Sequence, residues 1–291
     1  MTPVRRAGVL GRPIAHSLSP LLHRAAYRAL GLDWEYSLHD VGEGELGAFV
    51  GGLDDEWAGL SLTMPLKLEA VALADHMEPM AKLLGVANTL LFSGTGSARA
   101  VVGANTDVYG IGAALREAGL EDPSSALILG GGATATSAMA ALGEWGCLRP
   151  TIAVRSKQRA GGLIRAAAKM GLTPTFISPE GERGVADVAE AMRHADAVVS
   201  TIPADAANRL AEAATGAAKP GAPLLDAVYD PLDTPLLESW ARAGGTPVRG
   251  TQMLLHQAAH QVRLMTGKNA PIKEMNAALV AHLTAGMHHG Q

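Results

Sequence analysis

Residues 127–139, LILGGGATATSAM, place three glycines directly after an apolar run and directly before an alanine-rich segment. Glycines let a chain turn sharply and approach a pyrophosphate closely, and a helix that starts there offers unpaired N–H groups to the anion. Gly130 and Gly132 fill the first two positions of a G-x-G-x-x-G pattern, and Ala135 fills the third. A tight strand-to-helix turn that binds no ligand would show the same glycine pattern, so the surrounding sequence is needed to distinguish the two interpretations.

Short apolar runs alternate with helical segments on both sides of this loop, which is typical of an α/β protein with a parallel sheet. The turn SGTGS at 93–97 separates two apolar runs and predicts a hairpin. We expect strands at 8–10, 34–38, 59–62, 126–129, 151–154, 174–177, 196–200 and 222–228, and two closing helices at 251–266 and 272–285.

The chain of 291 residues is long enough for two domains of roughly 150 residues each. A strand-like run ends near 104–108, where the segment that leads to the glycine loop begins. The closing helices carry apolar residues such as Met253 and Val262, so we expect them to pack back on the N-terminal part. The predicted division is a discontinuous domain, 1–106 with 249–291, and a Rossmann-type domain at 107–248.

The composition excludes several classes of protein. Lys and Arg number 24 against 28 Asp and Glu, and the net charge of −4 argues against binding to nucleic acid or to a membrane surface. The one cysteine, Cys147, excludes an internal disulfide framework and fits a reducing compartment. No signal-peptide pattern is visible, and glycines interrupt the longest uncharged stretch at 123–143. We therefore expect a soluble, cytoplasmic protein.

The end of the strand after the glycine loop indicates which dinucleotide binds. A site that prefers NAD usually has an acidic residue there for the ribose hydroxyls, whereas TIAVRSKQRA at 151–160 has none. Arg155 can pair with a 2′-phosphate and stack on adenine, with Ser156 and Lys157 beside it. This pattern favours NADP, although the start of an exposed helix accounts for Arg155 as well.

Two N-terminal segments carry candidate chemistry. Ser17 and Ser19 precede Pro20, so we expect Ser19 to cap a helix and the two hydroxyls to form a small site for a carboxylate. Capping alone accounts for Ser19 but not for Ser17. Lys67 lies among apolar neighbours in LTMPLKLEA, and partial desolvation suits an amine for proton transfer, while an isolated lysine is more often a solvated surface residue. Asp107 starts a predicted helix, where an aspartate is often only a cap.

Seven separated stretches together resemble the shikimate dehydrogenase family over nearly the whole chain. The resemblance implies a substrate-binding α/β domain, an NADP-binding Rossmann domain and a cleft between them. It also implies the reversible, NADPH-dependent reduction of 3-dehydroshikimate to shikimate in aromatic amino-acid biosynthesis. We expect the protein to be a monomer or a homodimer. The stretches are GRPIAHSLSP, LTMPLK, GVANTL, GANTD, the GGGA loop, VYDPLDTPLL and GTQMLLHQAA.

The resemblance also implies roles for the matching residues, with Lys67 and Asp107 as the catalytic pair. The residues implied to bind substrate are Ser17, Ser19, Thr63, Asn88, Tyr229 and Gln257. Those implied to bind NADP are Gly130, Gly131, Gly132, Ala133, Arg155, Ser156, Gly250 and Met253. Four positions depart from the usual pattern, namely Ser61, Val108, Val154 and His256.

Two other functions fit parts of this pattern. One is an NAD-dependent quinate/shikimate dehydrogenase, which the basic strand end at Arg155 disfavours. The other is a catalytically silent paralogue that senses a metabolite, which has no need of Lys67 together with Asp107. His256 and His260 have a spacing that can bind a metal on a helix, but no third ligand is obvious and the implied reaction needs none.

Overall fold

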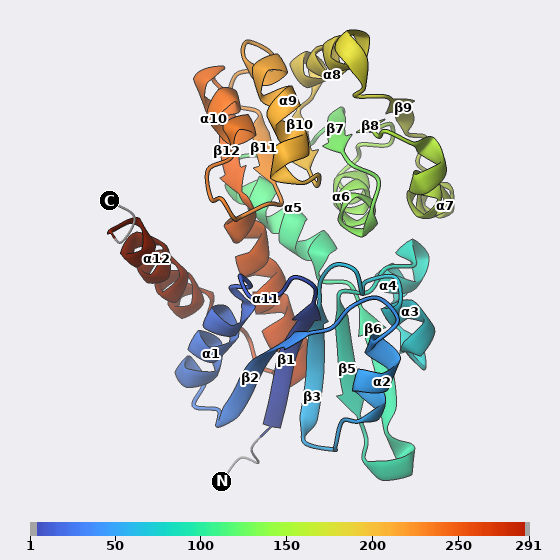
Figure 1. Cartoon of the computed structure of the whole chain (residues 1–291), viewed down its shortest axis with the longest axis vertical. Coiled ribbons are helices and arrows are strands. Elements are labelled where there is room, and N and C mark those ends of the chain that lie inside the picture. The colour runs from blue at the N-terminus through green and yellow to red at the C-terminus, as the bar shows by residue number, and fades with distance from the viewer. Residues whose placement is uncertain (1–4, 289–291) are drawn as a thin grey trace. The chain divides into compact units, whose positions relative to one another are not determined.

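The computed structural model describes residues 5–288, with side chains through residue 285, and it confirms the predicted α/β class. Two compact units are present (Figure 1): one joins Met1–Thr106 to Leu254–Gln291, and the other is Asp107–Met253. The chain returns to the first unit inside helix α11 (Gly250–Thr266), whereas the sequence places this boundary between 248 and 249. A helix that continues across a boundary leaves no change of composition there to predict it.

The second unit is built on a parallel sheet of six strands in the order β12-β11-β10-β7-β8-β9. Numbered within the unit from the opposite edge, this is 3-2-1-4-5-6, the order of dinucleotide-binding folds. The order reverses between β7 and β10, and ligands of such sheets bind beyond the carboxyl ends of the strands at that point.

The strands of this unit are β7 (Ala126–Leu129), β8 (Thr151–Ala153), β9 (Thr175–Ile177), β10 (Ala197–Ser200), β11 (Pro223–Asp226) and β12 (Thr246–Arg249). Its helices are α5 (Asp107–Glu117), α6 (Ala133–Glu144), α7 (Gly161–Met170), α8 (Gly181–His194), α9 (Ala204–Ala214) and α10 (Pro235–Arg242), with a 3₁₀ turn η2 (Lys157–Ala160). The sequence pattern does not predict β12, because TPVR is short and contains a proline.

Helices pack against this sheet in two sets of neighbours, α5–α7 and α8–α10. All four residues of β7 are buried, as expected for a central strand of a parallel sheet. Leu127 and Leu129 are two residues apart and therefore point to the same face of the sheet, where they pack in one core with α8, α9 and α10. Trp240 of α10 is fully buried in that core, and its indole Nε1 donates to the Ala222 carbonyl at 2.8 Å.

The first unit contains a mixed sheet in the order β2-β1-β3-β5-β6-β4. Strands β1, β2 and β3 are parallel, while β5 is antiparallel to both of its neighbours. The predicted hairpin at 93–97 is confirmed, because it connects β5 to β6. The strands are β1 (Arg5–Gly11), β2 (Trp34–Asp40), β3 (Trp57–Leu62), β4 (His76–Met77), β5 (Thr89–Ser93) and β6 (Ala100–Ala104).

The helices of the first unit lie on the two faces of its sheet. On one face Leu60 and Leu62 of β3 pack with α2 and α3. On the other face Ser61 points toward α11, and α12 packs against α1. Besides α11, the helices are α1 (Ser19–Ala29), α2 (Leu46–Gly51), α3 (Ala70–Leu73), α4 (Pro79–Leu84) and α12 (Ile272–His288), with a 3₁₀ turn η1 (Gly96–Ala98). Within residues 5–288, none of the helices has the length and apolar character that crossing a membrane requires.

Candidate functional site

The glycine loop of the second unit lies at the point where the strand order reverses. Gly130 follows β7 with φ +114°, a conformation that side chains rarely adopt. A Cβ added at Gly130 would collide with the hydroxyl of Thr201, the residue that follows β10. The turn therefore needs glycine at this position, because the ends of the two central strands approach each other here.

Gly132 differs from Gly130, since a Cβ added there would meet no atom within 4 Å in the described part of the chain. It is the exposed N-cap of α6, and glycine has no side chain with which to cap the first N–H groups of the helix. Those groups and the helix dipole suit an anion such as a pyrophosphate. The open space at Gly132 leaves room for the close approach of a dinucleotide, so the loop fits this cofactor.

Two alanine substitutions separate the two roles of glycine in this loop. We expect Gly130→Ala to lower the free energy of unfolding by about 1–3 kcal/mol, because it forces a side chain into a strained backbone conformation. Gly132→Ala should cost less, about 0.5–1 kcal/mol for a poorer N-cap, and it should raise KM for the dinucleotide, because the new methyl group occupies the approach to the helix. Urea unfolding and steady-state kinetics measure the two effects; equal loss of stability in both variants would contradict this assignment.

The basic residues after β8 lie at the carboxyl edge of the same sheet. The Arg155 side chain is exposed, and within residues 5–288 it makes no hydrogen bond or ion pair with another side chain. The Lys157 ammonium instead lies over the Phe176 ring, 4.9 Å from its centroid. Ser156 is the N-cap of η2 and is half-buried. Arg159 in η2 is exposed as well, so Arg155 and Arg159 are both available to a phosphate, and Arg155 lies nearer to the strand end.

The predicted cofactor residue Gly250 and the predicted substrate residue Tyr229 lie near the end of β11, and the predicted cofactor residue Met253 follows Gly250 by three residues on α11. Asp226 is buried and accepts from the Thr234 hydroxyl at 2.8 Å and from the Val228 N–H at 3.2 Å, which fixes the loop that leads to Tyr229. Gly250 begins α11, where an added Cβ would lie 2.7 Å from the Asp226 carbonyl oxygen. Tyr229 is half-buried and Met253 is buried.

The predicted carboxylate-binding serines lie between β1 and α1 in the first unit. Ser19 is the first residue of α1 and Leu18 is its N-cap, so the prediction that Ser19 caps this helix is wrong. The Ser17 hydroxyl accepts from the Ser19 N–H at 3.3 Å instead. The chain reaches the helical conformation one residue earlier than expected. The Ser17 side chain is half-buried and the Ser19 side chain is buried.

Lys67 lies on the loop that follows β3. Since β1 and β3 are parallel neighbours, this loop and the serines leave the sheet at the same edge. The Lys67 side chain is half-buried, and its carbonyl oxygen accepts from the Ala87 N–H at 3.0 Å, next to Asn88. Thr63, at the start of the loop, packs so closely on Gly11 that a Cβ there would collide with its methyl group.

Asn88 is buried at the start of β5 and is held by several polar contacts. Its Nδ2 donates to the Thr106 hydroxyl at 2.9 Å, and its Oδ1 accepts from the Thr106 N–H at 2.8 Å. Oδ1 also accepts from the Thr89 hydroxyl at 2.9 Å. A longer contact of 3.4 Å joins Nδ2 to Oε1 of Gln257 on α11, so the structure brings these two predicted substrate residues together.

Beneath Asn88 the structure contains a buried polar network that the sequence pattern does not predict. Gln261 is its centre: its Oε1 accepts from the Ser61 hydroxyl at 2.7 Å, and its Nε2 donates to the Thr89 hydroxyl at 3.0 Å. The Tyr36 hydroxyl donates to Ser61 at 2.6 Å, and burial raises the pKa of Tyr36, which keeps this donor protonated. Ser61, one of the departures from the family pattern, thus has a defined role here. The one available sequence signal is that Gln257 and Gln261 are spaced to share a helix face.

His23 completes this network. Its ring nitrogens lie 3.3 Å from the Tyr27 hydroxyl and 3.2 Å from Gln261 Oε1, and the ring stacks on Tyr36 with centroids 4.1 Å apart. Burial lowers the pKa of His23 from its usual value to about 3, against the smaller opposing effect of Gln261. The imidazole is therefore neutral in the folded protein at ordinary pH.

His23 should make the first unit sensitive to acid. Below pH 6.5 the unfolded chain protonates this imidazole, whereas the folded chain does not until about pH 3, so stability falls as the pH is lowered between these values. Between pH 7 and pH 5 the wild type should lose about 2 kcal/mol more unfolding free energy than His23→Gln. Urea unfolding at the two pH values measures this, with the exposed His282 replaced by Gln as the control. The same pH dependence in His23→Gln and wild type would refute it.

The predicted catalytic pair is divided between the two units. Lys67 belongs to the first unit, and Asp107 is the first residue of the second unit and of α5, where its side chain is fully buried. The pairing of the two residues stays a prediction. In the described part of the chain, no group of three or more His, Cys, Asp or Glu side chains is arranged to hold a metal ion.

Known proteins resemble this chain over almost its whole length. Residues 9–90 match the family model for the shikimate dehydrogenase substrate binding domain, and residues 250–280 match that for the shikimate 5′-dehydrogenase C-terminal domain. A protein of Citrifermentans bemidjiense named shikimate dehydrogenase (NADP(+)) is 38% identical, over 96% of this chain and 95% of its own.

Solved structures also resemble this chain over nearly its whole length. The crystal structure of Mycobacterium tuberculosis shikimate dehydrogenase is 42% identical with a TM-score of 0.83, and the match covers 95% of this chain and 99% of that one. Quinate dehydrogenase from Corynebacterium glutamicum, solved in complex with NAD, is 26% identical with a TM-score of 0.81, covering 96% of this chain and all of that one. The fold is thus shared by relatives with different substrates and cofactors.

Proposed function

Because this chain belongs to the shikimate dehydrogenase family, we propose that it catalyses the reversible, NADP-dependent reduction of 3-dehydroshikimate to shikimate. The observation that carries the proposal is the sequence similarity to proteins named shikimate dehydrogenase, which extends over both units of the chain. The basic strand end at Arg155, with no carboxylate in residues 151–160, supports NADP as the cofactor. The reaction belongs to aromatic amino-acid biosynthesis.

We assign the substrate to the first unit. Ser17 and Ser19 bind its carboxylate through their hydroxyls, at the start of α1. Asn88 and Gln257, which the structure brings together, contact the ring hydroxyls, as does Thr63. The Asn88 side chain is already fixed by Thr106 and Thr89, so little ordering is required of it when the substrate binds.

NADPH, when bound, supplies the hydride that reduces the ketone carbon. Negative charge then develops on the ketone oxygen, and Lys67 stabilises that oxygen and protonates it. Asp107 orients the Lys67 ammonium by accepting a hydrogen bond from it. In the direction of shikimate oxidation the same lysine accepts the hydroxyl proton.

The cofactor residues belong to the second unit. Gly130, Gly131, Gly132 and Ala133 present the helix N-terminus of α6 to the pyrophosphate. Arg155 and Ser156 bind the phosphate on the adenosine ribose. Gly250 and Met253 position the nicotinamide ring, and Tyr229 approaches the substrate from the cofactor side.

A second candidate function is that of an NAD-dependent quinate/shikimate dehydrogenase. The structural similarity to a quinate dehydrogenase solved with NAD supports this candidate. Assays of shikimate and quinate, each with NADP⁺ and NAD⁺, distinguish the candidates. We expect the highest kcat/KM for shikimate with NADP⁺. A higher value for quinate with NAD⁺ would favour the second function, and no turnover in any of the four assays would favour a metabolite-sensing paralogue.

Two properties of the protein in the cell also belong to this proposal. We propose a cytoplasmic enzyme, as the single cysteine and the moderate net charge suggest. We also propose a monomer or a homodimer, which sedimentation equilibrium at micromolar concentration decides. A larger assembly would contradict this part of the proposal.

A further inference from the structure

We infer that Arg12 and Glu69 are positioning residues of the substrate site, which hold its two loops at a fixed separation through a third loop. The inference rests on the proposed function, because it takes Ser17, Ser19 and Lys67 as the groups that meet the substrate. We call residues 12–18 the serine loop, residues 63–69 the lysine loop and residues 41–45 the middle loop.

The three loops leave one edge of the first unit's sheet. They follow β1, β3 and β2 respectively, and these three parallel strands are neighbours in the order β2-β1-β3. Backbone hydrogen bonds already connect this edge: the Arg12 N–H of the serine loop donates to the Met64 carbonyl of the lysine loop at 3.0 Å, and the Val41 N–H of the middle loop donates at 3.1 Å to the carbonyl of Gly11, the last residue of β1. The side chains of Arg12 in the serine loop and Glu69 in the lysine loop add contacts to the middle loop.

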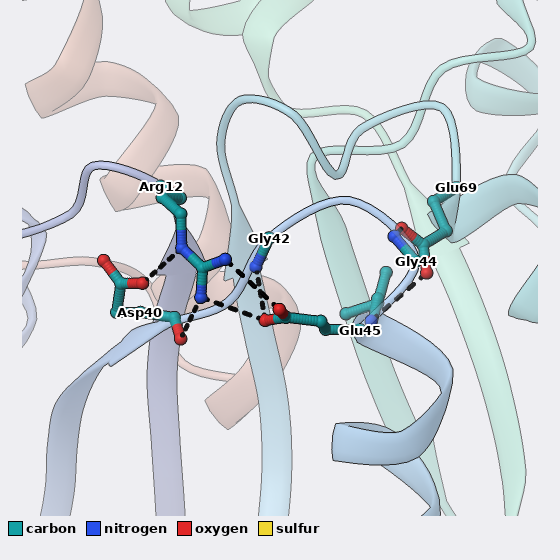
Figure 2. Close-up of polar contacts among 7 residues, drawn as sticks. Arg12, Asp40, Gly42, Gly44, Glu45 and Glu69 are labelled. Carbon is teal, nitrogen blue, oxygen red and sulfur yellow. Dashed lines mark hydrogen bonds and ion pairs between the residues drawn. The ribbon is translucent and has the colours of Figure 1, made fainter.

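Arg12 connects the serine loop to the middle loop (Figure 2). Its guanidinium donates to the Asp40 carboxylate and, at 3.0 Å, to Glu45 Oε2. Glu45 in turn accepts from the Gly42 N–H at 2.8 Å, so it closes the middle loop upon itself. A Cβ at Gly42 would collide with the guanidinium, which shows how closely Arg12 lies on this loop.

Glu69 connects the lysine loop to the other end of the middle loop (Figure 2). Its two carboxylate oxygens accept from backbone donors, Oε2 from the Gly44 N–H at 2.9 Å and Oε1 from the Leu46 N–H at 3.2 Å. Leu46 is the first residue of α2. Glu69 lies two residues after Lys67, so its position bears directly on where that lysine is held.

These contacts act on geometry more than on overall stability. The Arg12 side chain is 48% exposed to solvent, and ion pairs that are this exposed add little to the free energy of folding. Catalysis is more sensitive, because a displacement of about 1 Å between substrate-binding groups can cost about 100-fold in rate. Arg12 and Glu69 fix the middle loop from both sides and thereby the separation of the serines from Lys67.

The same sheet offers a matched control. Arg6, at the opposite end of β1, makes a similar exposed pair of ionic contacts, with Asp54 at 3.2 Å and with Glu56. Arg6→Ala therefore removes the same charge and the same kind of contact from the same strand, far from the three loops along it. A general effect of lost surface ion pairs would be equal at the two ends.

The experiment compares the steady-state kinetics of Arg12→Ala, Glu69→Ala and Arg6→Ala with the wild type. We expect the first two to raise KM for shikimate about tenfold and to lower kcat, because Lys67 is displaced together with the serines, while KM for NADP⁺ stays within about twofold and the unfolding temperature is nearly unchanged. Arg6→Ala should leave all three constants unchanged. The inference is overturned if Arg12→Ala and Glu69→Ala leave KM for shikimate unchanged, or if Arg6→Ala raises it equally.

Two further variants separate geometry from charge and from unfolding. Arg12→Lys keeps the positive charge but loses the forked donors that reach Asp40 and Glu45 together, so it should reproduce most of the effect of Arg12→Ala; wild-type kinetics in this variant would contradict the geometric role of Arg12. Glu69→Gln keeps one acceptor oxygen and should restore part of the affinity lost in Glu69→Ala. If Lys67→Ala and Ser17→Ala also leave turnover intact, the proposed substrate site is wrong. If these two variants impair turnover while Arg12→Ala and Glu69→Ala do not, the site stands and only the positioning role of Arg12 and Glu69 is wrong.

Discussion

Lys67→Ala should lower kcat for shikimate oxidation by about 10²–10⁴-fold, the usual contribution of a positioned acid–base group. The substitution removes the amine that we assign to the reacting oxygen. KM for NADP⁺ should stay within about twofold, because the cofactor residues belong to the second unit and Lys67 to the first. Initial rates measured at saturating and at limiting NADP⁺ separate the two constants.

The control for this prediction is Lys82→Ala. Lys82 is an exposed lysine on α4 of the same unit, so its loss changes the net charge equally without altering the lysine loop. It should leave kcat at the wild-type value. Retention of wild-type kcat in Lys67→Ala would show that another group transfers the proton.

Arg155→Ala should raise KM for NADP⁺ by about 10–100-fold, the equivalent of about 1.5–3 kcal/mol for a hydrogen bond between charged groups. The exposed Arg155 guanidinium follows the end of β8 by two residues, whereas the Lys157 ammonium is directed to the Phe176 ring, so we assign Arg155 to the 2′-phosphate. NAD⁺ lacks this phosphate, so its KM should change little. The ratio of kcat/KM for NADP⁺ to that for NAD⁺ measures the effect.

Arg209→Ala is the matched control for Arg155→Ala. Arg209 is exposed on α9 of the same unit, away from the strand end after β8. Its removal should leave the ratio of NADP⁺ to NAD⁺ efficiency unchanged. A loss of the same size with both cofactors in Arg155→Ala would reject a contact with the phosphate and favour a role in folding of the loop.

The parts of the fold that the sequence predicts are those with a local signal. The β7 run ALIL is apolar throughout because both faces of a central strand are buried, and its bounds are confirmed. The family and the α/β class are confirmed as well. β12 and β4 have no such signal, since one contains a proline and the other has two residues that only complete a sheet edge.

For the candidate site, the sequence by itself determined the kinds of chemical group: glycines for a close turn, an arginine without a carboxylate at the strand end, and serines and a lysine on separate loops. The conformational freedom of a glycine and the charge of a side chain are properties of single residues, so they can be predicted from a short stretch of sequence. Only the tertiary structure decided the partners, because packing brings together positions as far apart as Ser61 and Gln261, 200 residues from each other in the chain. The contacts of Arg12 and Glu69 with one loop arise in the same way, from strands that are neighbours in the sheet but not in the sequence.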